Sequence, residues 1–185
     1  MLAPRRHPLV LVLLACLSLA VIPGSAAAKS PGCADASTRP GNASEAVLSN
    51  ATVCLINRER ARRGLRSLSV NNRLSRAAVS HTRDMIEKRY FAHESKSGLD
   101  VVDRLLSTGY LGRVRNWLVG ENLAWGSGSR STPREAVAGW MNSPGHRRNM
   151  LNRRFREIGI GVVFSAPHDR ARTAATYTTT FGTRR

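Results

Sequence analysis

An apolar segment at the amino terminus most constrains what this chain can become. Arg5 and Arg6 precede an apolar run over residues 9–22, and three alanines follow at residues 26–28. A basic start, an apolar run and a small-residue site are typical of a secretory signal that is cleaved during export. Pro23-Gly24 closes the run short of the ~20 apolar residues that a membrane span requires. We therefore expect cleavage and not a membrane anchor.

This signal sets the domain organisation. We expect residues 1–28 to be a signal peptide, residues 29–43 a flexible Ser-, Pro- and Gly-rich arm, and residues 44–185 one domain. The domain is long enough to bury a core of its own without a dense disulfide framework. Export predicts a secreted protein, with the periplasm or cell envelope as the alternative, and no transmembrane segment after signal cleavage.

The predicted export also decides how the three cysteines of the chain are interpreted. Cys16 lies inside the apolar run, in a Leu-Leu-Ala-Cys sequence that loosely resembles a lipobox, so a lipid anchor on Cys16 is the alternative to its removal. Cys33 and Cys54 remain after cleavage. Because exported proteins meet an oxidising environment, a disulfide between them is favoured over a metal site. It would tie the arm to the first helix.

The charge balance is strongly basic. The chain has 29 Lys and Arg against 12 Asp and Glu, a net charge of +17. Such a field favours anionic partners, such as acidic lipid headgroups or cell-wall polymers. The sequence has no zinc-finger spacing and no RNP-like aromatic motif, so we expect no specific nucleic acid partner. The arginines are spread along the whole chain, and we prefer a solvated surface to any specific polyanion site.

Apolar periodicity and helix-capping residues predict four helices, and Thr- and Gly-rich segments predict strands. The predicted helices are residues 45–63 before Gly64, 72–88, 101–108 after Asp100, and 133–143, the last with a capping box at Thr132 and a stop at Pro144-Gly145. The predicted strands are residues 158–164 and 176–181, with a third near 120–126 because two strands alone are marginal. Helices on both sides of a small sheet are the economical arrangement.

Three polar residues stand beside predicted turns, where sites are often built. They are His93, Glu121 and His146. Two imidazoles and a carboxylate suit a divalent metal site, and the same groups also suit acid and base roles without metal. A single histidine is more often a hydrogen-bonded structural residue. His81 illustrates this, because it falls on the buried face of its predicted helix, where we expect a bond to nearby backbone.

Four linked motifs occur in order along the chain. They are Phe91-Ala92-His93, Gly120-Glu121-Asn122-Leu123-Ala124, Trp140 with Ser143-Pro144-Gly145-His146-Arg147-Arg148-Asn149-Met150-Leu151, and Ile158-Gly159-Ile160-Gly161-Val162. In this order they resemble the CAP superfamily of cysteine-rich secretory proteins, antigen 5 proteins and plant pathogenesis-related proteins, whose common unit is the SCP domain. The chain is most similar to the bacterial secreted branch, over roughly residues 47–182.

The resemblance implies an α+β fold, a three-layer α/β/α sandwich with a small central antiparallel sheet. It also implies a pocket with two histidines and two acidic residues. By motif, His93 and His146 match the histidines and Glu121 matches one acid, whereas Ser143 stands at the segment of the other. This departure weakens any mechanism that needs two carboxylates, because one carboxylate cannot supply separate acid and base roles.

The family implies an extracellular binding module for a lipid, a sterol, a cell-envelope component or a protein partner. No cofactor is required, and His93 and His146 would hold zinc or another divalent cation reversibly, since catalytic zinc usually has three protein ligands. The alternative is a metal-assisted hydrolase, in which the two histidines hold the ion and Glu121 positions the attacking water. We expect binding in preference to catalysis.

Overall fold

The computed structural model describes residues 32–168 and 173–185. The predicted signal peptide, Cys16 and the first three residues of the predicted arm (29–31) lie outside the described residues. Within the described part, no helix is both long and apolar enough to cross a membrane.

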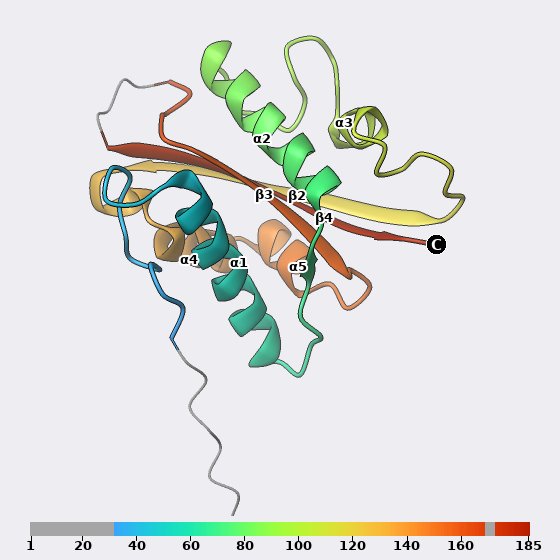
Figure 1. Ribbon diagram of the computed structural model, residues 1–185, viewed down its shortest axis with the longest axis horizontal. Coiled ribbons are helices and arrows are strands. Elements are labelled where there is room, and N and C mark those ends of the chain that lie inside the picture. The colour runs from blue at the N-terminus through green and yellow to red at the C-terminus, as the bar shows by residue number, and fades with distance from the viewer. Residues whose placement is uncertain (1–31, 169–172) are drawn as a thin grey trace, which may run out of the picture. The chain divides into compact units, whose positions relative to one another are not determined.

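A four-stranded sheet forms the middle layer, in the order β1-β3-β4-β2. Its strands are β1 (Ser69–Val70), β2 (Trp117–Ser127), β3 (Glu157–Val163) and β4 (Ala174–Arg184). One face is covered by α2 (Asn72–Glu87) and α3 (Val101–Ser107), as Figure 1 shows. The other face is covered by α1 (Glu45–Ala61), α4 (Pro133–Asn142) and α5 (Pro144–Leu151). The predicted three-layer α/β/α sandwich is confirmed.

The sheet is largely, but not wholly, antiparallel. β4 pairs antiparallel with β2 along its whole length, from Trp117↔Arg184 to Ser127↔Ala174, which explains why β4 is longer than predicted. β3 also pairs antiparallel with β4. The predicted antiparallel pairing holds for β2, β3 and β4, whereas the short β1 pairs parallel with β3. This two-residue strand forms because Ser69 and Asn71 donate backbone bonds to Arg156 and Ile158, a tertiary contact that no local pattern signals.

The predicted helix starts are confirmed, but the capping box predicted at Thr132 is found at Asp100. Ser44 and Thr132 each cap a helix, accepting from the backbone N–H of Val47 and Glu135. The complete capping box lies instead at Asp100, whose side chain accepts from the backbone N–H of Asp103 while the Asp103 side chain accepts from the backbone N–H of Asp100. In the described part of the chain, the Glu135 carboxylate makes no return bond to Thr132. Glu135 is therefore available for other contacts.

The fifth helix is one that the sequence does not predict. The predicted end of the fourth helix before Pro144-Gly145 is confirmed, since α4 ends at Asn142, but Pro144 then begins α5 after a single extended residue, Ser143 (ψ 120°). Proline suits the first position of a helix because its φ is already helical and its missing N–H would be unpaired there. Ser143 and His146 consequently lie at the corner between two helices.

The core lies between the sheet and the α1, α4 and α5 layer. Trp140, Phe155 and Phe181 are among its largest side chains, and the two phenylalanine rings stack at 5.5 Å. The predicted disulfide between Cys33 and Cys54 is present and joins the arm to α1. A smaller core lies under α2 and α3 around Leu74, Leu105 and Tyr110.

Glycines allow α2 to lie directly on β3. A Cβ added at Gly159 would lie 2.1 Å from the backbone of Leu74, and one at Gly161 would lie 2.6 Å from that of Ala78. The alternating glycines of β3 thus permit the close packing that the sequence suggested.

Candidate functional site

The site is built around the outer edge of β2. Successive side chains of a strand point to opposite faces, so Glu121 points to the α2 and α3 layer and Asn122 to the α5 layer. Accordingly, Glu121 bonds to Arg104 of α3, and the Asn122 amide donates to the His146 carbonyl of α5 (3.1 Å). Because β2 ends the sheet, the site can draw on both helical layers.

Motif side chains cover the backbone of this edge. The Asn149 amide donates to the carbonyl of Glu121 (3.1 Å) and to the Asn122 side chain (2.9 Å). The Trp140 indole N–H donates to the carbonyl of Leu123 (2.8 Å). These bonds satisfy carbonyls that an edge strand would otherwise leave open. Several motif residues thus hold Glu121 in place and make no direct chemical contribution.

The Glu121 carboxylate is buried and already paired. Its side chain is 3% exposed. The Arg104 Nη2 atom donates to Oε2 (2.9 Å) and to Oε1 (3.1 Å), and His93 Nδ1 lies 2.9 Å from Oε1. Arg104 also donates to the carbonyls of His93 and Leu99, which fixes the loop between α2 and α3. The sequence analysis missed Arg104, since nothing marks it among the chain's 29 Lys and Arg.

His81 is the buried structural histidine that the sequence predicted. It is 1% exposed, and its Nε2 lies 3.0 Å from the carbonyl of Ala92. Since a carbonyl only accepts, Nε2 carries the proton. Nε2 also lies 3.9 Å from Glu121 Oε1, a proximity the sequence did not reveal. Burial lowers the pKa of His81 below 6.5, and the charge of Glu121 opposes this only in part, so the ring is neutral at neutral pH.

His93 presents one ring nitrogen to the carboxylate and one outward. Its side chain is 58% exposed, with Nδ1 on Glu121. A carboxylate oxygen accepts this hydrogen bond, so Nδ1 is the donor and Nε2 is the ring nitrogen that Glu121 leaves unused. A carboxylate that fixes a histidine in this way is the usual outer partner of a metal-binding imidazole. In this geometry Glu121 orients His93 and is not itself placed as a ligand.

Ser143 and His146 line a hollow along α4. The hollow has a volume of about 560 Å³. It is lined by Phe91, Leu123, Ala124, Trp125, Arg130, Glu135, Ala136, Ala138, Gly139, Trp140, Asn142, Ser143, His146 and Tyr177. His93 and Glu121 do not line it, although Phe91 does. Burial, and next the charge of His93, lowers the pKa of His146, which keeps that ring neutral at neutral pH. His93 thus lies near enough to influence His146.

Glu135 lines the same hollow but cannot replace the missing acid. It stands in the first turn of α4, whereas Ser143 follows the last. At about 1.5 Å per residue, the seven residues from Glu135 to Asn142 span about 10 Å. Glu135 and His146 therefore mark opposite ends of an elongated hollow and cannot share one ion.

A larger hollow lies away from these residues. It measures about 990 Å³ over the outer faces of α2 and α3, with polar side chains such as Arg76, Arg83 and Glu87 in its lining. None of the predicted site residues belongs to it. Its size alone gives no chemical reason to prefer it.

The donor set allows at most a weak metal site. Within residues 32–168 and 173–185, no group of three or more His, Cys, Asp and Glu side chains is placed to hold an ion. The imidazole nitrogens of His93 and His146 are donors of the type that zinc accepts, and water would have to complete the coordination.

Comparison with known proteins gives a consistent picture. Residues 53–180 match the model of the cysteine-rich secretory protein family, CAP. An uncharacterized protein of Bacillus subtilis, YkwD, is 37% identical over 141 residues, which are 75% of this chain and 52% of YkwD. The chain thus spans about half the length of that relative.

Solved structures agree. An extracellular protein of Bacillus anthracis that contains an SCP domain is 31% identical, with a TM-score of 0.56 over 72% of this chain and 38% of that one. An outer surface protein of Borrelia burgdorferi has a TM-score of 0.59 over 72% of this chain and 90% of its own. At 22% identity, this second likeness shows the fold alone.

Proposed function

We propose, since the chain belongs to the CAP family of cysteine-rich secretory proteins, that it is an extracellular binding module whose ligand pocket is the hollow along α4. The Bacillus anthracis relative with a solved structure is described as an extracellular protein, which supports the location. The ligand we assign is an envelope lipid or sterol with a polar end.

The lining of the hollow carries this proposal. Its volume of about 560 Å³ lies within the range of small-molecule sites, which are mostly apolar with a few placed polar groups. Trp125, 38% exposed, and Trp140 supply aromatic surface between the two ends. The lining also holds the polar side chains of Arg130, in the segment before α4, Glu135 in the first turn of α4, and His146 of α5. This arrangement suits an elongated amphiphile.

A divalent cation would have a supporting role in this pocket. Burial lowers the pKa of His146, and Glu121 orients the His93 ring through Nδ1. Two imidazoles completed by water would bind zinc reversibly. When bound, the ion would supply a positive charge for the polar end of a ligand.

The surroundings of Glu121 weigh against the hydrolase alternative. A general base must reach a water molecule and accept its proton. Both oxygens of Glu121 already accept hydrogen bonds, and its side chain is 3% exposed.

A blocking substitution tests the binding proposal. A Cβ at Gly139 meets nothing within 4 Å, so Gly139→Leu places a side chain in the hollow without a clash. The change also removes a helix glycine, which adds up to about 1 kcal/mol of stability. With dansylaminoundecanoic acid as the probe, we expect parent protein to bind and Gly139→Leu to lose at least about tenfold in affinity, equivalent to about 1.4 kcal/mol.

Ala61→Leu is the matched control, since Ala61 is an exposed residue of α1 outside the hollow. Equal probe affinity in all three proteins would contradict the proposed pocket. Ester and peptide substrates, with and without chelator, test the alternative. Chelator-sensitive turnover that disappears in Glu121→Gln would overturn the binding role.

A further inference from the structure

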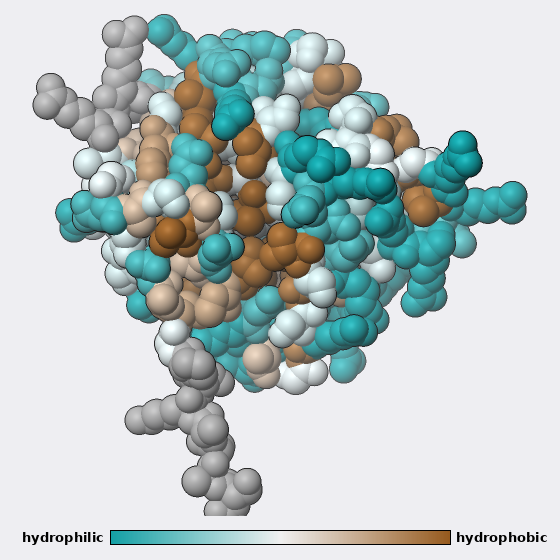
Figure 2. Space-filling model, in the orientation of Figure 1, coloured by the Kyte–Doolittle hydropathy of each residue, from teal (hydrophilic) through white to brown (hydrophobic). Residues whose placement is uncertain are grey.

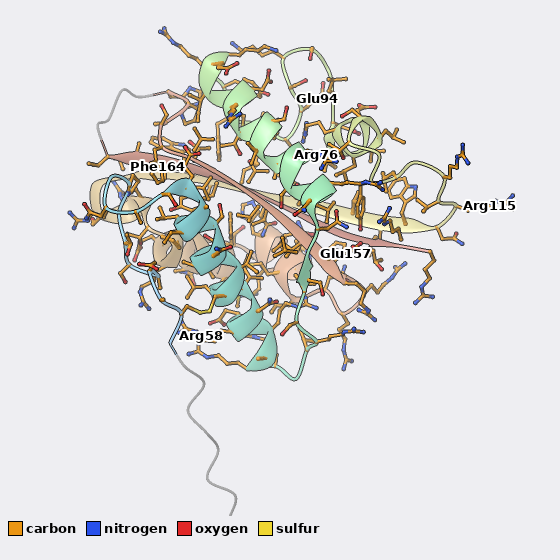
Figure 3. All side chains as sticks on the ribbon, in the orientation of Figure 1. Arg58, Arg76, Glu94, Arg115, Glu157 and Phe164 are labelled. Atoms are coloured by element: carbon orange, nitrogen blue, oxygen red, sulfur yellow. A yellow bond between two sulfur atoms is a disulfide. The ribbon has the colours of Figure 1, made fainter. Side chains whose placement is uncertain are left out.

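A third, separate hollow lies where β2 begins and β4 ends. Its volume is about 370 Å³. It is lined by Asn116, Trp117, Leu118, Arg153, Arg154, Arg156, Thr183 and Arg185, none of which lines the hollow along α4. Four of these eight residues are arginines and none is acidic. Figure 2 shows hydrophilic side chains projecting from this end of the molecule, and Figure 3 shows Arg115 pointing outward beside it.

These four arginines have no carboxylate partner. In the parts of the chain that the structure describes, no Asp or Glu oxygen lies within 4.0 Å of Arg153, Arg154, Arg156 or Arg185. Their neighbour Arg184 differs, because it lies 3.9 Å from Glu157 and over the ring of Tyr110 at 4.7 Å. The arginines that line the hollow therefore have no nearby acidic side chain to balance their charge, whereas Arg184 beside the hollow has Glu157.

The backbone that carries the arginines is held in place. The N–H of Arg154 donates to the Asn152 side chain (2.9 Å), that of Arg156 to the Gly182 carbonyl (3.0 Å), and that of Arg185 to the Asn116 carbonyl (2.9 Å). The three segments that form the hollow are thus joined by hydrogen bonds. A site whose backbone is already ordered loses less entropy on binding.

A buried arginine adds to the same field. Arg60 is fully buried and donates to the carbonyls of Met150 (2.7 Å) and Asn152 (3.1 Å), directly before the arginine segment. Burial, and next the charge of Arg156, lowers the pKa of Arg60. Like charges gathered in this way raise the free energy of the unliganded protein, and a bound anion relieves it.

Trp117 gives the hollow an apolar wall. The indole is 44% exposed and stands with Leu118 among the arginines. A ligand that alternates phosphate with short carbon segments matches this alternation of guanidinium and apolar surface. Arginine is the side chain best suited to phosphate because its planar fork binds two oxygens at once.

We propose that this hollow binds a phosphodiester-linked polymer of the cell envelope, with phosphates on Arg153, Arg154 and Arg185 and the linking carbons against Trp117. A concave site admits a single chain, whereas a membrane surface requires side chains that protrude together from a flat or convex face. The proposal concerns a different site from the α4 hollow. From the sequence we preferred a solvated basic surface to a specific polyanion site, and the proposal replaces that preference for this hollow alone.

The test uses a synthetic glycerol phosphate oligomer as the probe, titrated into mature protein at rising sodium chloride. Arg153→Gln/Arg154→Gln/Arg185→Gln should bind at least about tenfold more weakly, because charge-assisted bonds are lost. The slope of log affinity against log salt should fall by about 2, from three phosphate contacts at about 0.7 each. The charge-matched control is Arg66→Gln/Arg76→Gln/Arg83→Gln, all exposed and outside the hollow, and should bind as the parent does.

Two results would overturn the proposal. Equal weakening in both triple variants would mean diffuse attraction to a basic protein. Binding to vesicles of equimolar phosphatidylcholine and phosphatidylglycerol, without binding to the oligomer, would assign the surface to a membrane. Far-UV circular dichroism of each variant checks that the fold is retained.

Discussion

Removal of Arg104 should destabilise the fold more than removal of any exposed arginine. Arg104 and Glu121 form a buried ion pair, with side chains 9% and 3% exposed and a 2.9 Å bond. Arg104→Met keeps most of the side-chain length but leaves the Glu121 carboxylate buried with His93 as its remaining hydrogen-bond partner. Breaking a buried pair on one side lowers the free energy of unfolding by about 3–5 kcal/mol.

A double-mutant cycle isolates the pair. Glu121→Gln leaves the Arg104 cation uncompensated and should destabilise by a comparable amount. Arg104→Met/Glu121→Gln removes both charges, so its loss should be smaller than the sum of the single losses by at least about 2 kcal/mol. The free energies come from urea unfolding followed by far-UV circular dichroism. Arg83→Met is the control, because Arg83 is exposed, and should change stability by less than about 0.5 kcal/mol.

Additive losses of unfolding free energy in the two single variants would contradict a coupled ion pair. If the double variant loses the sum of the single losses to within about 0.5 kcal/mol, the two side chains are not coupled. The same conclusion follows if Arg104→Met is no more destabilising than Arg83→Met. Glu121 would then lack the charge compensation that defines its role as a positioning residue.

Three further outcomes are expected. The unfolded chain binds a proton at His81 at higher pH than the folded protein, so stability should fall as pH drops below 6.5, and His81→Gln should flatten that dependence. An unchanged pH slope in urea unfolding would contradict it. Replacing Cys33 and Cys54 together by serine should lower the free energy of unfolding by about 3 kcal/mol, and an unaltered urea midpoint would count against the bridge. Zinc titrated calorimetrically should bind the parent and be lost in His93→Ala and in His146→Ala, whereas equal binding in all three would exclude the histidine site.

Local sequence signals predicted the helices that begin with a clear capping residue. Ser44, Asp100 and Thr132 cap helices, because their side chains satisfy free backbone N–H groups at helix starts. The disulfide followed from export chemistry. In contrast, β1 exists only through its parallel pairing with β3, and α5 begins at the proline that was expected to end α4. The strand β1 depends on a tertiary contact. The helix α5 was missed because a proline can mark either the end of one helix or the start of the next.

The candidate site was predicted only as a set of residues. Motif resemblance singled out His93, Glu121, Ser143 and His146, but their arrangement depends on the β2 edge, which sends neighbouring side chains to opposite layers. Arg104 could not be found, because its pairing with Glu121 is a tertiary contact with no sequence spacing of its own. The hollow along α4 likewise arises from packing and not from a motif.

The hollow along α4 is proposed to hold a lipid-like ligand. Native mass spectrometry of the protein isolated from its native cells and their medium tests this when parent and Gly139→Leu are compared. We expect one bound lipid or sterol on the parent and none on Gly139→Leu. Equal lipid content in both proteins, or none in either, would contradict it.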